Sequence, residues 1–149
     1  MAKRSSSIGQ DASREPLASV RVLVVDNSEP WRRWICSLFR THAQLHVVGE
    51  VGDGLEAVRK ARKLKPDLIL LEIGLPNLNG IEAASRIVQA AHGVKIIFLT
   101  LHESAHVLRA ALSNGARGYV LKSAAADELF PAIEAVLRGE KFVSRLLNQ

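Results

Sequence analysis

The sequence predicts an α/β protein with a five-stranded parallel sheet, doubly wound as (βα)5, in the strand order 2-1-3-4-5. Two observations predict this fold. Short apolar runs alternate along the 149 residues with longer segments in which apolar residues recur at helical spacing. The apolar runs also lack the alternation of a half-exposed strand, which is typical of strands that helices cover on both faces of a parallel sheet.

The first strand–helix unit follows a polar stretch at the start of the chain. Residues Val20–Val25 (VRVLVV) form the first predicted strand. A helix is predicted to begin at Glu29-Pro30, because proline is tolerated in the first turn and Ser28 can cap the helix. Helical spacing predicts that this helix turns three residues toward the core: Trp31, Ile35 and Leu38.

The second and third units have the same form. Leu45–Val51 (LHVVGEV) is the second predicted strand, and Leu55–Leu64 is a helix that Pro66 ends. Leu68–Leu71 (LILL) is the third predicted strand and runs without alternation. The loop that follows is rich in glycine, asparagine and proline, and the next helix is predicted at Ile81–Ala91.

The fourth and fifth units complete the pattern. Val94–Leu99 and Gly118–Leu121 are predicted strands, and Ser104–Asn114 and a segment from about Asp127 to Arg138 are predicted helices. Pro131 predicts a late start or a slight kink in the last helix. Right-handed crossovers and the short chain favour the flavodoxin-like strand order, which places a ligand crevice beside the first and third strands.

Four of the predicted strands end at a polar side chain, namely Asp26, Glu72, Thr100 and Lys122. Because parallel strands present their carboxyl ends along one edge of the sheet, we predict that these side chains form a single site. Burying a carboxylate at the end of the fully apolar third strand costs stability. Its presence there suggests that it has a function. The alternative is a buried ion pair of Lys122 with Glu72 and Asp26, without further chemistry.

The residue types at this edge suit a phosphoryl group and a magnesium ion. Asp26, Asn27 and Glu72 offer the hard oxygen ligands that Mg²⁺ prefers. Lys122 supplies a positive charge and Thr100 a hydroxyl, and both can bind phosphoryl oxygens. The edge is therefore a candidate site for binding or receiving a phosphoryl group.

The motifs of several other protein classes are missing from the sequence. There is no GxxxxGK[ST] or GxGxxG loop after the first strand and no GxSxG elbow. The five histidines show no HExxH spacing, and His102 and His106, four residues apart, lack an evident third ligand. We therefore expect neither a P-loop enzyme, a dinucleotide-binding enzyme or a serine hydrolase, nor a histidine metal centre.

Length and composition predict one domain in a reducing compartment. We predict the domain at residues 19–139, after a disordered tail at residues 1–18 and before a C-terminal tail or linker start at residues 140–149. The single Cys36 excludes an intrachain disulfide, and no segment approaches the ~20 apolar residues of a membrane helix. We expect a cytoplasmic protein, with much of its net charge of +5 on a solvated helix face around residues 59–65.

Four segments carry a resemblance to a known family: VLVVDNSEPWRR, PDLILLEIGLPNLNGIEA, IIFLT and GARGYVLKSAAADEL. Together they span about Val20 to Arg138 and resemble the receiver domain of bacterial two-component response regulators, above all the LuxR/NarL type. The resemblance implies phosphorelay signalling rather than an enzymatic function. In this family a sensor histidine kinase donates a phosphoryl group to an aspartate at the end of the third strand, and Mg²⁺ is required.

Two positions of the implied phosphorylation site depart from the family pattern. The phosphoacceptor position holds Glu72 instead of aspartate, and the acidic pocket is Asp26-Asn27, in which a neutral amide replaces one carboxylate. The implied metal ligands are Asp26, Glu72 and the backbone of Gly74, and the lower negative charge predicts weak or absent Mg²⁺ binding. Glu72 would also protrude toward the place of a phosphoryl group, and in-line attack tolerates little misplacement.

The resemblance further implies a pair of switch residues. Thr100 holds the position of the switch hydroxyl, Tyr119 that of the switch aromatic residue, and Lys122 that of the lysine that contacts the phosphate. In the family, the threonine and the aromatic residue shift together and change the surface of the fourth helix, fifth strand and fifth helix. Tyr119 turned inward beside a displaced Thr100 would indicate an active-like arrangement.

Three hypotheses for the function remain open from the sequence. The first is an atypical receiver that phosphorylation does not control, in which Glu72 imitates the modified state or locks one state. The second is that the parent protein has aspartate at this position, and that Glu72 was engineered or arose as a variant. The third is a small doubly wound enzyme or flavin-binding module at the same crevice, for which the acidic loop after the first strand is poorly suited.

The resemblance also implies partners. A sensor histidine kinase is expected, unless the departures at Glu72 and Asn27 have removed that interaction. A homodimer is predicted, and signalling would run through protein–protein contacts or a DNA-binding output domain. DNA would be bound only through such an output domain, which these 149 residues do not include, and no membrane contact is expected.

Overall fold

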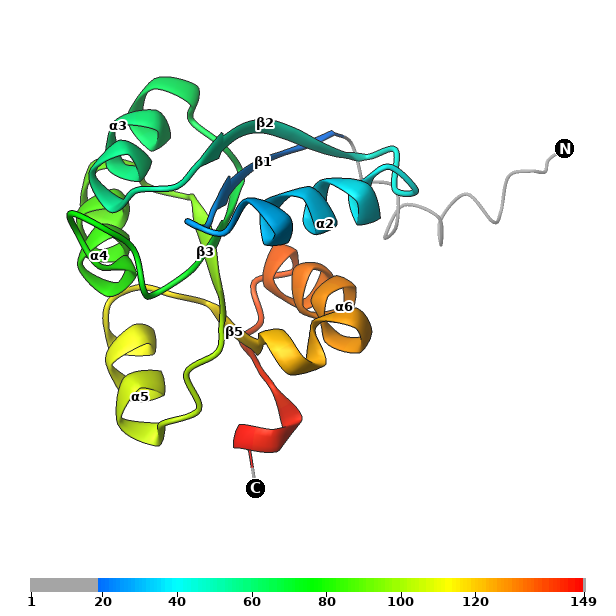
Figure 1. Cartoon of the computed structure of the whole chain (residues 1–149), viewed down its shortest axis with the longest axis vertical. Helices are drawn as coiled ribbons and strands as arrows, with labels where there is room; N and C mark the ends of the chain where they lie inside the picture. Colours follow the sequence, from blue (N-terminus) through cyan, green and yellow to red (C-terminus); the bar gives the residue numbers. More distant parts are fainter. Residues whose placement is uncertain (1–18, 149) are drawn as a thin grey trace, which may run out of the picture.

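The computed structural model describes residues 19–148 and shows a parallel sheet with helices on both of its faces (Figure 1). The predicted disordered tail at residues 1–18 lies outside the described residues. The domain boundary predicted at residue 139 stays a prediction. What the structure decides is how the strand ends are arranged, and this arrangement positions the candidate site.

The elements alternate between strand and helix over most of the chain. The strands are β1 (Val20–Val25), β2 (Leu45–Val51), β3 (Leu68–Leu71), β4 (Lys95–Thr100), β5 (Gly118–Leu121) and β6 (Phe142–Val143). The α-helices are α2 (Glu29–Phe39), α3 (Gly54–Leu64), α4 (Gly80–Ala90), α5 (Ala105–Ser113) and α6 (Ala125–Leu137). Two short 3₁₀ helices are η1 (Lys122–Ala124) and η2 (Arg145–Leu147).

The sheet has the strand order β2-β1-β3-β4-β5-β6, and all of its strand pairs are parallel. The predicted flavodoxin-like order of the first five strands is confirmed, but the prediction of five strands was wrong. The sixth strand, β6, pairs with Gly118 and Tyr119 of β5. Because β6 has only two residues, it is too short to show the two-residue hydrophobic periodicity of a strand in the sequence. The strand forms by pairing with the edge of β5.

The core consists of two apolar layers, one on each face of the sheet. Helices α3, α4 and α5 cover one face, and α2 and α6 cover the other (Figure 1). Strand β3 shows the division, because Ile69 and Leu71 belong to the first layer and Leu68 and Leu70 to the second. All four side chains are buried, which is the physical reason for the unbroken apolar run in the sequence.

Polar side chains cap the helices that lead away from the strand ends. Ser28 caps α2 as predicted, and Asp53, Asn79 and Ser104 cap α3, α4 and α5 by accepting hydrogen bonds from first-turn N–H groups. The helix bounds differ from the prediction by one or two residues, as is usual at fraying ends. Helix α6 begins at Ala125 and continues through Pro131.

The described α-helices have 9 to 13 residues. At 1.5 Å per residue, the longest spans about 20 Å, whereas the hydrocarbon core of a bilayer is about 30 Å thick. Within residues 19–148, no helix is long and apolar enough to cross a membrane.

Candidate functional site

The four polar residues predicted at the strand ends come together at the carboxyl edge of the sheet. Asp26 follows β1, Glu72 follows β3, Thr100 ends β4, and Lys122 follows β5. All four are buried, with exposed fractions of 2%, 6%, 0% and 8%. The backbone ladder continues past the strands, since the Glu72 N–H donates to the carbonyl of Val25 at 3.0 Å. The parallel register therefore places these side chains next to one another.

Glu72 lies at the centre of the cluster. Its Oε2 accepts a hydrogen bond from the Thr100 hydroxyl at 2.6 Å. The same oxygen accepts the backbone N–H groups of Ile73 at 2.6 Å and Gly74 at 3.2 Å. Its Oε1 lies 2.9 Å from the Nζ atom of Lys122. Both carboxylate oxygens are therefore occupied by donors of the protein itself.

Lys122 joins the two carboxylates of the site. Its Nζ atom lies 2.8 Å from Oδ2 of Asp26 and 2.9 Å from Oε1 of Glu72. The other oxygen of Asp26 accepts the backbone N–H of Ser28 at 2.8 Å, which ties the carboxylate to the start of α2. The buried ion pair considered from the sequence is thus present, and it joins two of the four strand-end residues to each other through Lys122.

The electrostatics of the cluster favour an ionised Glu72. Burial raises the pKa of the Glu72 carboxyl, because a charge is harder to maintain away from water. The hydrogen bond from Thr100 and the hydrogen bond and charge of Lys122 outweigh burial, so that the pKa lies below its usual value. Glu72 therefore carries a negative charge across the physiological pH range.

Thr100 and Tyr119 adopt an inward arrangement. The Thr100 hydroxyl points to Glu72, and the Tyr119 side chain is fully buried. The Tyr119 hydroxyl donates to the backbone carbonyl of His102 at 2.9 Å, in the loop that follows Thr100. Burial, and secondarily the charge of Glu72, raises the pKa of Tyr119 to about 12, so the ring stays neutral.

The predicted carboxylate ligands of a magnesium ion are engaged by donors of the protein itself. Of the predicted ligands, Asp26 and Glu72 use all four of their carboxylate oxygens for protein donors, while Asn27 and Gly74 lie exposed. In the part of the chain that the structure describes, no group of three His, Cys, Asp or Glu side chains could hold a metal ion. Mg²⁺ prefers several free oxygen ligands, so it would have to displace Lys122 from its two partners.

Sequence reasoning missed a second polar cluster below the site. Ser144 is fully buried, and its Oγ donates to Glu128 on α6 and accepts the backbone N–H of Leu121 at 2.9 Å. The Ser144 N–H donates to the carbonyl of Tyr119 at 2.9 Å. The residues after 139 thus bind the strand that precedes Lys122. A lone serine in the short segment at residues 142–147 provides no sequence signal for such a contact.

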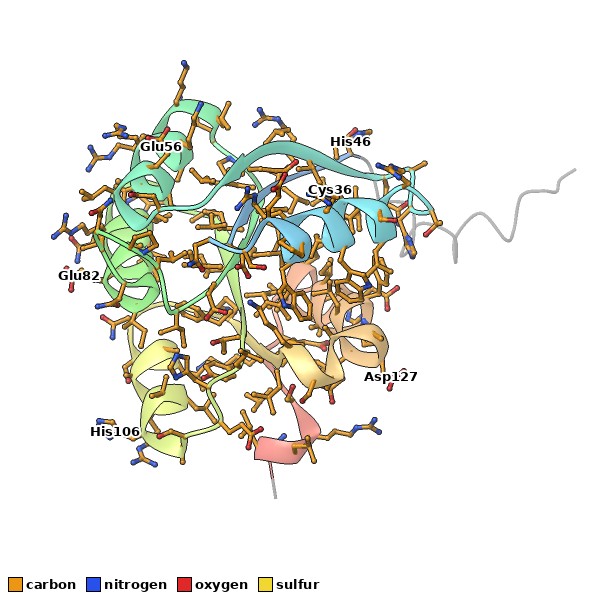
Figure 2. All side chains as sticks on the ribbon, viewed as in Figure 1. Cys36, His46, Glu56, Glu82, His106 and Asp127 are labelled. Carbon is orange, nitrogen blue, oxygen red and sulfur yellow. The ribbon has the colours of Figure 1, made fainter. Side chains whose placement is uncertain are left out.

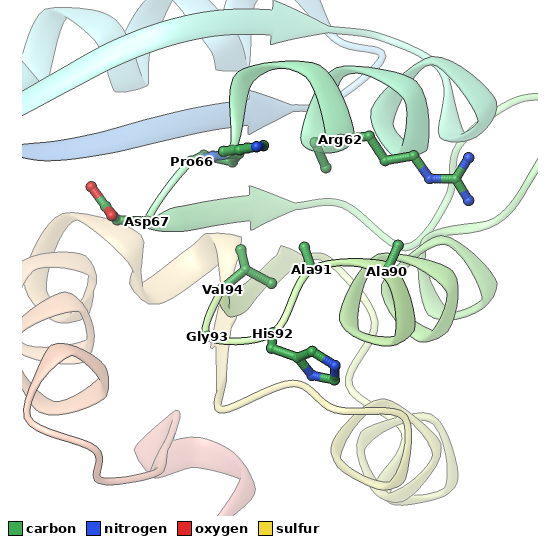
Figure 3. A pocket seen from close by; sticks show the side chains of 10 residues that line it. Arg62, Pro66, Asp67, Ala90, Ala91, His92, Gly93 and Val94 are labelled. Carbon is green, nitrogen blue, oxygen red and sulfur yellow. The ribbon is translucent and has the colours of Figure 1, made fainter.

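A surface hollow of about 350 Å³ lies at the opposite edge of the sheet (Figure 3). It is bordered by the ends of α3 and α4 and by the segments that lead into β3 and β4, and its polar lining includes Arg62, Lys65, Asp67 and His92. None of the four converging strand-end residues lines it. The hollow is therefore separate from the candidate site.

The histidines do not gather. His46 on β2 and His106 on α5 lie at opposite ends of the molecule (Figure 2). His106 is exposed on α5, and His102 contributes its backbone carbonyl to Tyr119.

Comparison with known proteins shows the same family throughout. The family model for the response regulator receiver domain matches residues 22–134. The chain is 33% identical over 130 residues to the response regulator GacA of Pseudomonas viridiflava, covering 87% of this chain and 61% of that protein. It is 35% identical over 119 residues to the transcriptional regulatory protein YdfI of Bacillus subtilis, covering 80% and 55%. The chain therefore spans less than two thirds of the length of these relatives.

Solved structures agree in fold. A two-component response regulator of the LuxR family from Aurantimonas sp. SI85-9A1 superimposes with a TM-score of 0.84 at 33% sequence identity, covering 89% of this chain and 94% of that one. The response regulator domain of Thermotoga maritima CheB superimposes with a TM-score of 0.75 at 36% identity, covering 80% and 97%.

Proposed function

The chain belongs to the response regulator receiver domain family of two-component signalling, and we propose that it is an atypical member in which Glu72, rather than phosphorylation, sets the signalling state. The observation that carries this proposal is the contact set of Glu72. Its carboxylate engages both the Thr100 hydroxyl at 2.6 Å and the Lys122 ammonium at 2.9 Å. These are the two groups that the family uses to contact the phosphoryl group.

Glu72 imitates a modified acceptor because it is one methylene longer than aspartate. The extra length lets one side chain reach the hydroxyl on β4 and the ammonium beyond β5 at the same time. The imitation is partial, since a carboxylate carries one negative charge and a phosphoryl group nearly two. The inward Tyr119, bonded to the carbonyl of His102, supports an active-like setting of the switch.

Two features argue against phosphoryl transfer to Glu72. Both of its oxygens already accept hydrogen bonds, so neither is free to attack a phosphorus atom. The carboxylate also lies where the incoming phosphoryl group would have to be, and a displacement of about 1 Å can cost about 10²-fold in rate. The chain thus relays a fixed state rather than a transient one.

Receiver domains typically bind Mg²⁺ in their acidic pocket, and in this chain we propose that the binding is weakened. Asn27 contributes no charge, and Lys122 neutralises one of the two remaining carboxylates. A smaller net negative charge lowers the attraction for a divalent cation.

Receiver domains are in general signalling domains rather than enzymes, and we propose no enzymatic activity for this chain. Its partners would be a second copy of the chain, a protein target, or a DNA-binding output domain in a longer protein. A sensor histidine kinase remains a partner only if its docking surface has survived the loss of the acceptor. We further propose a cytoplasmic location, as for a soluble signalling protein without a membrane helix among its described residues.

The test is the intact mass of the protein after incubation with Mg²⁺ and a small acyl phosphate. The wild type and Glu72→Asp are compared, with Glu82→Asp as a control at an exposed carboxylate on α4. We expect a phosphoryl adduct only on Glu72→Asp, which would mean that the rest of the site works. A stable adduct on wild-type Glu72 would refute the proposal. If none of the three proteins forms an adduct, the inability to be phosphorylated would be assigned to Asn27 and weakened metal binding as well as to Glu72.

A further inference from the structure

Trp31 lies directly beside the candidate site. It occupies the first turn of α2, where its backbone N–H donates to the Ser28 hydroxyl at 3.4 Å. Its half-buried ring belongs to the apolar layer between α2 and α6. The sequence predicts this core position, but the ring also covers the Lys122 ammonium, whose Nζ atom lies 4.8 Å from the ring centroid.

The ammonium of Lys122 needs a third partner. A lysine has three N–H donors, and the carboxylates of Asp26 and Glu72 account for two of them. With only 8% of Lys122 exposed, water has little access to the remaining donor. The face of an indole ring carries partial negative charge and attracts a cation within about 6 Å. Trp31 therefore supplies the partner that buried charge requires.

A second tryptophan packs against the first. The rings of Trp31 and Trp34 meet edge to face, with centroids 5.2 Å apart and planes at 79°. Such pairs are attractive because the positive edge of one ring meets the negative face of the other. Trp34 belongs to the same apolar layer and pairs with Trp31, which makes it a suitable control position.

We propose that Trp31 is a positioning residue that closes the site on the α2 side and holds the Lys122 ammonium against Glu72 and Asp26. This inference rests on the proposed function, in which the contact between Lys122 and Glu72 keeps the switch in one setting. Trp31 shields that contact from water, so that the ammonium has no competing partner. A tryptophan that only filled space in the core could be replaced by any apolar side chain without changing Lys122.

The experiment measures the reactivity of Lys122 toward a water-soluble acylating reagent, by peptide mass spectrometry of the native protein. The exposed Lys63 on α3 serves as the internal standard. The variants are Trp31→Leu, which removes the aromatic face, Trp31→Phe, which keeps one, and Trp34→Leu as the control. Urea titration gives the unfolding equilibrium constant of each variant. From this constant we calculate the rate at which Lys122 would be labelled if it reacted only in the globally unfolded protein.

We expect Trp31→Leu to raise the labelling of Lys122 by about 5- to 30-fold over the wild type and above the global-opening rate, which is the range of a desolvated cation–π contact. Trp31→Phe and Trp34→Leu should stay within about 3-fold of the wild type. Equal labelling of Trp31→Leu and Trp31→Phe, or labelling that only follows global unfolding, would overturn the proposal.

Different measurements decide the role of Glu72 and the role of Trp31. Phosphorylation of wild-type Glu72 would end the proposed function, but the labelling of Lys122 would still decide what Trp31 does. Conversely, an unreactive Lys122 in Trp31→Leu would remove the role of Trp31 and leave the contacts of Glu72 with Thr100 untouched.

Discussion

Replacing the Glu72 carboxylate by an amide of the same size should destabilise the fold by about 2–4 kcal/mol at neutral pH. The substitution Glu72→Gln loses one charge-assisted contact with Lys122, worth about 1.5–3 kcal/mol, and weakens the hydrogen bond from Thr100. The cost is smaller than that of fully orphaning a buried charge, because Asp26 still compensates Lys122 at 2.8 Å.

The effect of Glu72→Gln should depend on pH in a defined direction. The folded-state pKa of the Glu72 carboxyl is lowered, chiefly because hydrogen bonds from Thr100 and Lys122 outweigh burial. Its contribution to stability is therefore complete above the unfolded-state pKa of about 4.3 and is lost as the pH falls through the folded-state value. The variant has no carboxyl, so the difference between the two proteins should shrink below a pH of about 4.

The assay is urea unfolding at neutral pH and again under acidic conditions, with Glu82→Gln as the matched control. Glu82 forms an exposed pair with Arg86 at 3.4 Å, and its loss should cost about 0–0.5 kcal/mol. Unchanged m-values would show that the unfolded states are comparable. The reasoning would be refuted if both variants lost the same stability, or if the difference for Glu72→Gln persisted unchanged in acid.

Three further outcomes follow from the structure. The chain's single tyrosine, Tyr119, should titrate near pH 12 by ultraviolet absorbance, and a midpoint near 10 would contradict its buried position. Because its folded-state pKa is raised, its contribution to stability is present below pH ~10 and is lost as the pH rises toward 12. Ser144→Ala should cost about 1–3 kcal/mol in urea unfolding, because it leaves buried polar groups unpaired, whereas Ser123→Ala at an exposed position should cost under about 0.5. In thermal unfolding, Gly80→Ala should cost more than about 2 kcal/mol, since its Cβ would lie 2.1 Å from a backbone oxygen of the site, while Gly74→Ala, with nothing within 4 Å, should be nearly neutral.

Much of the fold is determined by local sequence patterns. The run Leu68–Leu71 is apolar at every position because both faces of β3 are buried, and this burial can be read without knowing its neighbours. Ser28 caps α2 because its hydroxyl accepts a hydrogen bond only three residues along the chain. Alternation of such strands and helices leaves few topologies, so the order of the first five strands also follows.

The sequence also determines which side chains meet at the carboxyl edge of the sheet. Asp26, Glu72, Thr100 and Lys122 each stand at the end of a strand, and parallel pairing brings the ends together whatever the details of packing. Their identity as a candidate site is therefore a property of strand order.

Only the tertiary structure decides which groups are paired within that edge. The contacts of Glu72 with Thr100 and Lys122 join residues 28 and 50 positions apart, and they depend on side-chain reach and register rather than on any local pattern. The same holds for the inward Tyr119, for Trp31 above the ammonium, and for the two-residue strand β6. The periodicity of apolar residues in the sequence predicts which side chains are buried. The hydrogen-bond partner of a buried polar group depends on three-dimensional packing.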